Sequence, residues 1–245
     1  MEAVLSIMNY VGYCPICEKQ ARFVAENDWF RDSLICQSCN HGSVPRERSL
    51  ALILKEIFPN WRNLSIHESS PAARGISLQL AQECAKYVGS QYYPDRPFGS
   101  MVGNFRNENL EHLTFNADTF DITITLDVME HIYNPDLVIS EIWRTLKSGG
   151  AYICTFPVRK AQVIGWERRF ENLALGSRRD FKEPEMHGNP IDGSGSIVTI
   201  DWGYDLHKEF SSWAPFDVRV MRFNDYTHGI LGEYTEVLVC RKRNL

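Results

Sequence analysis

The chain has 245 residues, of which 44% are hydrophobic and 23% charged, and its formal net charge is −5. A chain of this length can bury one substantial core and a small additional unit, and the acidic balance argues against a nucleic-acid-binding protein. It has no apolar run of about 18 residues, which excludes a membrane-spanning helix, and a start without a basic region or long apolar stretch makes us expect a cytoplasmic protein.

Four of the seven cysteines come in two close pairs, Cys14-Pro-Ile-Cys17 and Cys36-Gln-Ser-Cys39. A pair on a tight turn directs two sulfurs to one ion at about 2.3 Å, and two pairs complete a tetrahedron. The spacing predicts a zinc ribbon over residues 1–45, with a structural Zn²⁺ held by Cys14, Cys17, Cys36 and Cys39. The alternative is a set of unrelated thiols.

Residues 1–45 carry three Lys or Arg against five Asp or Glu. A segment without a positive face attracts phosphate weakly, so nucleic acid is not the expected partner of the ribbon. Support of the fold or contact with the substrate is the better interpretation.

Beyond the cysteines, helical and strand-like patterns alternate. We expect helices at 46–60, 72–85, 134–147, 159–173 and 206–213, and strands at 63–67, 86–91, 120–126, 151–156, 216–223 and 235–240. Such alternation predicts an α/β fold with a parallel sheet covered on both faces. The helix at 46–60 would connect the ribbon to a domain over 61–245, with an insert at about 158–205.

Three segments of this domain resemble motifs of a known family. Residues 106–121 end in Leu-Thr-Phe-Asn-Ala-Asp-Thr-Phe-Asp, residues 126–136 read Leu-Asp-Val-Met-Glu-His-Ile-Tyr-Asn-Pro-Asp, and residues 146–150 read Leu-Lys-Ser-Gly-Gly. In this order and spacing they resemble the class I S-adenosylmethionine-dependent methyltransferases. The resemblance implies a Rossmann-like, mostly parallel sheet whose last strand is antiparallel. The loop after residue 67 lacks the usual Gly-x-Gly-x-Gly pattern, which resembles a bacterial subgroup with a nonstandard glycine loop.

The resemblance also implies the residues that bind S-adenosylmethionine. They follow the ends of successive strands, where ligands bind in open parallel sheets: Glu68, Ser69, Ser70, Gln91, Tyr92, Asn109, Leu110, Asp127 and Val128. Glu68 would supply the acidic group of the first loop, although Ser69 or Ser70 also suits an ordinary helix N-cap. Gln91 stands where relatives have a carboxylate, and its amide can accept from one ribose hydroxyl.

Three residues are candidates for catalysis. Methyl transfer is an in-line displacement, so the protein mainly aligns the acceptor and sometimes removes its proton. His131 has a suitable pKa for a general base, and Glu130 would orient it or bind a substrate amine. The alternative is that both residues merely begin a helix. His187 lies in a Gly- and Pro-containing stretch over residues 184–192, which we interpret as a lid or as a plain surface loop.

The segment 158–182 is basic, with seven Lys or Arg against three Asp or Glu. It would attract an anionic substrate or form the solvated face of a helix. The sequence thus predicts an S-adenosylmethionine-dependent methyltransferase for a small-molecule or glycan-type acceptor, methylated at oxygen or nitrogen, and the basic segment would suit an anionic one. The alternatives are an RNA- or protein-modifying enzyme that docks its substrate on the ribbon, and a cofactor-binding protein without catalysis.

Overall fold

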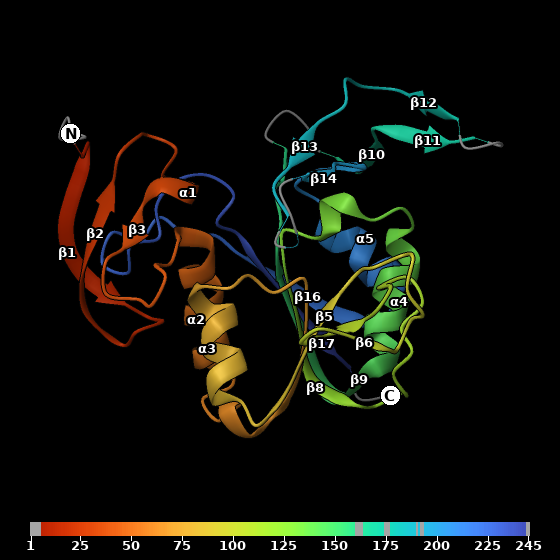
Figure 1. The fold of residues 1–245 in the computed structure, drawn as a ribbon, viewed down its shortest axis with the longest axis horizontal. Coiled ribbons are helices and arrows are strands. Elements are labelled where there is room, and N and C mark those ends of the chain that lie inside the picture. The colour runs from red at the N-terminus through yellow and green to blue at the C-terminus, as the bar shows by residue number, and fades with distance from the viewer. Residues whose placement is uncertain (1–5, 160–163, 174–176, 190, 192–193, 244–245) are drawn as a thin grey trace.

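An eight-stranded sheet forms the centre of the computed structural model, which describes residues 6–159, 164–173, 177–189, 191 and 194–243 (Figure 1). From edge to edge its strands are β16 (Phe216–Met221), β17 (Val237–Lys242), β9 (Leu146–Thr155), β8 (Phe120–Leu126), β4 (Ser65–Ser69), β5 (Lys86–Gln91), β7 (Phe105–Asn107) and β6 (Met101–Val102). The strands from β9 to β7 are parallel, β17 is antiparallel to both its neighbours, and β6 is antiparallel to β7. The predicted α/β fold with a mostly parallel sheet is confirmed.

Helices cover both faces of this sheet. Helices α2 (Pro45–Ile57) and α3 (Gly75–Glu83) lie on one face, and α4 (Pro135–Thr145) and α5 (Leu206–Trp213) lie on the other (Figure 1). The alternation of side chains along β9 separates the two cores, since Ala151 and Ile153 join one apolar cluster and Tyr152 and Cys154 the other. Burial on both faces explains why β9 is continuously apolar from Ala151 to Cys154.

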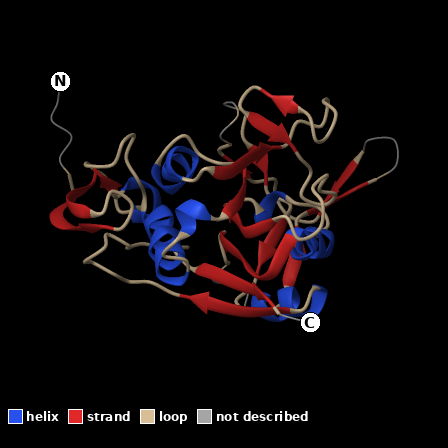
Figure 2. Cartoon of the chain, turned by 90° about the horizontal axis from the view of Figure 1, so that it is seen from below, coloured by secondary structure: helices blue, strands red, loops and turns tan. Residues whose placement is uncertain are grey.

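A small antiparallel sheet lies beside α2, well apart from the large one (Figure 2). It contains β1 (Met8–Cys14), β2 (Lys19–Ala25) and β3 (Ile35–Cys36), and the short helix α1 (Phe30–Ser33) precedes β3. Its apolar side chains belong to the same buried cluster as those of α2.

Arg48 of α2 fastens this small sheet to a distant part of the chain. Its side chain is fully buried, and its guanidinium donates to the backbone oxygens of Ser43, Leu34 and Gly229. Gly229 has φ +66°, and a Cβ there would lie 2.8 Å from the Phe23 ring. A residue with a side chain would therefore clash with the small sheet.

The insert after β9 differs from the prediction. The expected helix at 159–173 is wrong in its described part, which forms β10 (Trp166–Arg168) and β11 (Phe170–Asn172); residues 160–163 lie outside the described residues. β10 pairs with β15 (Ile200–Trp202), and β11 pairs with β12 (Arg178–Asp180). Pairing with strands remote in sequence decided the conformation here, because local propensity is only a weak preference.

The end of α4 also differs from the prediction. The helix ends at Thr145, and β9 begins at once with Leu146, which pairs with Phe120. The segment Ser148–Gly150, which we expected to stop the helix, therefore lies inside β9. No helix in the described ranges is long and apolar enough to cross a membrane.

Candidate active site

The carboxyl ends of β4, β5 and β8 meet at one edge of the large sheet, and a cavity of about 400 Å³ opens there. All the residues predicted to bind the cofactor except Glu68 line it: Ser69, Ser70, Gln91, Tyr92, Asn109, Leu110, Asp127 and Val128. They come from four separate parts of the chain, so the parallel sheet brings them together.

Glu68 lies apart from this cavity. Its carboxylate is fully buried and accepts hydrogen bonds from the hydroxyls of Ser77, at 2.5 Å, and Tyr87, at 2.8 Å. Burial raises the pKa of Glu68 to about 7. The structure thus places this carboxyl group under α3 instead of against a ligand, which corrects its predicted position.

The loop between β4 and α3 is tight without a run of glycines. Ser70, which lines the cavity, has φ 57°, and Gly75, the first residue of α3, has φ 55°. A Cβ on Gly75 would lie 2.2 Å from Oε2 of Glu47, a residue of α2. The Glu47 carboxylate also accepts from Arg74 at 2.8 Å and from the Val44 amide at 3.0 Å. A side chain from α2 therefore fills the space beside this loop.

Gln91 ends β5 and is 2% exposed. Among the described residues its Oε1 atom has no hydrogen-bond partner, although its side chain lines the cavity. An unpaired buried amide oxygen costs free energy that a donor from a ligand would recover. The observation fits a ribose hydroxyl.

A second, larger cavity of about 970 Å³ adjoins the first. It lies between the small sheet with α2, the ends of β8 and β9, and the insert, and Trp29 and Tyr234 are among its aromatic lining residues. The two cavities share Ser70, Asp127, His131, Gly188 and Asn189. A ligand in one cavity would therefore meet a ligand in the other beside His131.

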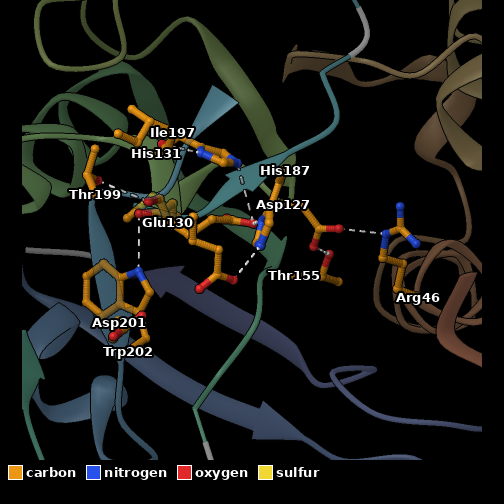
Figure 3. Close-up of polar contacts among 12 residues, drawn as sticks. Arg46, Asp127, Glu130, His131, Thr155, His187, Ile197, Thr199, Asp201 and Trp202 are labelled. Atoms are coloured by element: carbon orange, nitrogen blue, oxygen red, sulfur yellow. Dashed lines mark hydrogen bonds and ion pairs between the residues drawn. The ribbon is translucent and has the colours of Figure 1, made fainter. Parts of the chain in front are cut away.

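The three predicted catalytic residues lie together at this junction (Figure 3). His131 Nδ1 lies 2.8 Å from the Ile197 backbone oxygen, which can only accept. Nδ1 therefore carries a hydrogen, and Nε2 is the acceptor nitrogen of the neutral ring. Glu130 Oε1 lies 3.8 Å from His131 Nε2 and 3.4 Å from His187 Nδ1.

The insert delivers His187 to this point. His187 lies on β13 (Met186–His187), which pairs with β14 (Ser196–Ile197). Thr199 continues from this hairpin and donates its amide to the Glu130 backbone oxygen at 2.7 Å. The Glu130 carboxylate raises the pKa of His187, opposed by burial. Residues 184–189 are thus a pocket wall; Pro190 and Asp192 of the predicted lid lie outside the described residues.

Two arginines at the site were not predicted from the sequence. Arg31 Nη2 and Arg46 Nε each lie 2.7 Å from Asp127 Oδ2. Burial alone would raise the pKa of Asp127, but the two guanidiniums outweigh it and hold that pKa below its usual value. Asp127, with φ 55°, therefore ties α1 and α2 to the end of β8. No local pattern marks a contact between residues so distant in sequence.

Three of the basic residues of the insert converge on one buried carboxylate. Asp201, 4% exposed, accepts from Arg159 at 3.0 Å, Arg169 at 3.0 Å and Lys182 at 2.8 Å. The charges of these three residues are therefore paired within the insert. They neither form the solvated face of a helix nor stand unpaired to attract an anionic substrate. Lys160 lies outside the described residues.

The four paired cysteines converge at the end of the small sheet. One sulfur from each lies within 4.8 Å of the other three, with 3.5 Å between Cys14 and Cys39 and 4.0 Å between Cys17 and Cys36. Sulfurs bound to one Zn²⁺ at about 2.3 Å in a tetrahedron lie roughly 3.8 Å apart. The arrangement of the thiols thus fits a zinc ion.

Part of the chain is similar in sequence to known proteins. Residues 71–154 match the family described as "Methyltransferase domain". A curated relative, the ubiquinone biosynthesis O-methyltransferase of Agrobacterium fabrum, is 26% identical over 138 residues, which are 53% of this chain and 55% of that protein. The chain therefore spans about half the length of this relative.

Solved structures share the fold at low identity. The S-adenosylmethionine-dependent methyltransferase from Mesorhizobium loti has a TM-score of 0.53 and 15% identity, covering 80% of this chain and 98% of that one. The 1,6-didemethyltoxoflavin-N1-methyltransferase of Burkholderia thailandensis, solved with 1,6-didemethyltoxoflavin and S-adenosylhomocysteine, has a TM-score of 0.50 and 14% identity, covering 81% and 79%. Residues 71–154 are therefore similar to the methyltransferase domain family, and the chain has the fold of the S-adenosylmethionine-dependent methyltransferases.

Proposed function

We propose that this protein is an S-adenosylmethionine-dependent methyltransferase that methylates an oxygen or nitrogen of a small molecule. The junction of two cavities at His131 carries the proposal. Their volumes, about 400 and 970 Å³, are of the size that small ligands and cofactors occupy, about 300–1,000 Å³. The smaller cavity would hold the cofactor, and the larger one the acceptor.

The residues of the smaller cavity suit the cofactor. Gln91 Oε1 would accept from a ribose hydroxyl, Leu110 and Val128 offer apolar surface to the adenine, and Tyr92 would flank it. When bound, S-adenosylmethionine supplies a methyl group already activated on a sulfonium sulfur. The protein therefore has only to bind, orient and deprotonate the acceptor.

His131 is the group best placed to take a proton from the acceptor. It lines both cavities, and in the neutral ring the bond from Nδ1 to the Ile197 carbonyl leaves Nε2 as the nitrogen that can accept a proton. General-base catalysis by a positioned side chain typically contributes about 10²–10⁴-fold in rate. Glu130 and His187 would set the position and charge of this ring from the other side.

The larger cavity favours a compact acceptor with a ring. Trp29 and Tyr234 bring aromatic surface to it, with ring centroids 6.1 Å apart, and such faces suit a flat heterocycle or a sugar. The names of two similar proteins support a small-molecule acceptor: the Agrobacterium protein is named for ubiquinone biosynthesis, and the Burkholderia protein was solved with 1,6-didemethyltoxoflavin. An anionic acceptor has less support, because Arg31, Arg46 and Arg159 are already paired with carboxylates.

We also propose that residues 1–45 are a zinc ribbon whose Zn²⁺ is structural. Four thiolates fill a tetrahedral ion and leave no position for a substrate. The fully buried Arg48, which donates to the Ser43 hydroxyl, would offset the negative charge of such a centre. The ribbon then supports α1 and α2, which carry Arg31 and Arg46 to Asp127.

The test measures binding first and turnover second. Calorimetric titration with S-adenosylhomocysteine should give saturable binding, and S-adenosylhomocysteine release should then be assayed with panels of hydroxyl- and amine-bearing ring compounds, RNA and protein. His131→Ala should bind the cofactor product normally yet lose about 10²–10⁴-fold in kcat, while His112→Ala, an exposed histidine elsewhere, should retain activity. Methylation of RNA or protein alone would support a macromolecular substrate. If S-adenosylhomocysteine does not bind at high micromolar concentration, the proposed methyltransferase function is overturned.

A further inference from the structure

The carboxylate of Glu130 poses an electrostatic problem at the junction of the two cavities. Glu130 is 2% exposed, and neither of its carboxylate oxygens has a hydrogen-bond partner among the described residues. A buried carboxylate without a counter-charge costs several kcal/mol, so such groups are paired or bind a metal. The rings of His131 and His187 lie within 3.8 Å of it, and the guanidinium of Arg31, which pairs with Asp127, also acts on it electrostatically.

In both rings one nitrogen, here called inward, faces Glu130, and the other, here called outward, bonds to a different oxygen. The outward nitrogen of His131, Nδ1, bonds to the Ile197 backbone oxygen at 2.8 Å, and that of His187, Nε2, bonds to Glu185 Oε1 at 3.0 Å. Metal-binding histidines show this same pattern, since a second oxygen fixes the tautomer and leaves the other nitrogen free to coordinate.

The inward atoms have the spacing of metal ligands. Glu130 Oε1 lies 3.4 Å from His187 Nδ1 and 3.8 Å from His131 Nε2, and one ligand atom from each residue lies within 4.8 Å of the others. Two ligands of a tetrahedral ion with bonds of about 2.0–2.1 Å lie roughly 3.4 Å apart. A cation between the three atoms would also place positive charge directly against Glu130 (Figure 3).

We propose that Glu130, His131 and His187 bind a divalent transition-metal ion that is distinct from the ion of the four cysteines. Two imidazoles and one carboxylate suit Zn²⁺, Co²⁺ or Fe²⁺, whereas Mg²⁺ and Ca²⁺ take oxygen ligands. Three protein ligands leave at least one position for a substrate atom, as in catalytic zinc sites.

The position of this ion specifies the acceptor and rests on the proposed methyltransferase function. His131 faces both cavities, so the open position would face the acceptor. A metal lowers the pKa of a hydroxyl that binds it, and the proton then leaves to water. The acceptor atom is therefore an oxygen, and His131 acts through the ion instead of taking the proton itself.

The test counts metal ions independently of turnover. Protein that holds a single equivalent of zinc, bound by the four cysteines, is titrated with Co²⁺ alone, while absorption is recorded. One further equivalent should bind, with weak visible bands of nitrogen and oxygen coordination and no near-ultraviolet thiolate-to-cobalt band. His187→Ala and Glu130→Gln should each abolish this binding or weaken it more than about 100-fold, beyond the 10–100-fold effect of losing an outer hydrogen bond.

A matched variant provides the control. His228 also lies beside a carboxylate, with Nδ1 2.6 Å from Asp225 Oδ2, but far from the site in sequence and outside both cavities. His228→Ala should bind Co²⁺ as the wild type does. Circular dichroism and S-adenosylhomocysteine affinity, unchanged in His187→Ala, would show that the variant is folded and that the cofactor cavity is intact.

Each outcome of this titration either supports or overturns the proposed metal site. No Co²⁺ binding beyond the zinc already present, binding with thiolate bands only, or full binding by both ligand variants would overturn the metal site. The ion pair of Glu130 with a protonated His187 would then be the only arrangement at the junction. If the wild type does not bind S-adenosylhomocysteine, the proposed function is overturned, but the number of metal ions bound per chain is unaffected.

Discussion

Arg31 of α1 and Asp127 at the end of β8 form a buried ion pair, with 2.7 Å between Nη2 and Oδ2. The two residues are 96 positions apart, and Asp127 lines both cavities. The stability of the N-terminal sheet and the shape of the site therefore depend on the same contact.

Replacing Arg31 with methionine should destabilise the protein through this contact. Arg31→Met keeps much of the apolar stem but leaves Asp127 with Arg46 alone, and loss of one partner of a buried pair costs about 3–5 kcal/mol. Because Arg46 remains, we expect a loss of roughly 2–4 kcal/mol in the free energy of unfolding, measured by urea denaturation. The exposed Arg22→Met should stay within about 0.5 kcal/mol of the wild type. Equal stability of the two variants would contradict the role of the pair.

Zinc content should depend on Cys14 and not on Cys84. Cys14→Ser removes a thiolate ligand and should lower the zinc bound per chain by one equivalent, measured by elemental analysis, with loss of structure around the small sheet. Cys84 is equally buried but donates to the Leu64 carbonyl, a bond that serine keeps, so Cys84→Ser should retain the metal. Unchanged zinc in Cys14→Ser would refute the four-thiolate site.

Gln91→Leu should weaken the binding of S-adenosylhomocysteine about tenfold. The substitution removes the unpaired Oε1 acceptor, and one hydrogen bond contributes about 1–1.5 kcal/mol, or close to a tenfold change in Kd. Calorimetry measures the effect, with the exposed Gln20→Leu as the control. Equal affinity in wild type and Gln91→Leu would mean that the ligand does not bond to this amide.

The stability of the protein should fall between pH 4.5 and about 7 because of Glu68. Its folded-state pKa is about 7 against an unfolded value of 4.5, so in this window the native state holds a proton that the unfolded state has lost. The contribution of the protonated group is complete below pH 4.5 and lost above pH 7. At 1.36 kcal/mol per pKa unit, the change is on the order of 3 kcal/mol.

Glu68→Gln isolates this effect. A glutamine cannot ionise, and its amide can still bond to Ser77 and Tyr87, so the variant should gain about 3 kcal/mol relative to wild type between pH 5 and pH 8. Denaturant unfolding at both values measures it. Exposed Glu56→Gln should run parallel to the wild type. A parallel profile for Glu68→Gln as well would show that the carboxyl group titrates alike in both states.

Regular elements with a strong local signal were predicted well. The strand at 120–126 and the helix at 206–213 have the predicted bounds, because periodic burial against one core fixes them. Pro45 begins α2 as expected, since its ring suits the first turn of a helix. The helix predicted for the insert was wrong, because the short strands found there are held by pairing with other strands of the same chain and by ion pairs with Asp201.

The candidate site shows the same division. The motifs of the sequence named residues at the strand ends that line one cavity, and also the group Glu130, His131 and His187. The functional roles of all these residues stay predictions. The motifs placed Glu68 wrongly, because the choice between cavity and core depends on Ser77 and Tyr87 from α3 and β5.

The sequence by itself determined the alternation of elements, the two pairs of cysteines and the order of the methyltransferase motifs, since each is written in local spacing. Only the tertiary structure decided that Arg31 and Arg46 neutralise Asp127, that Glu47 packs against Gly75 beside the loop, and that His187 reaches Glu130. These contacts join residues far apart in the chain. Their energy depends on burial and distance, which no local pattern encodes.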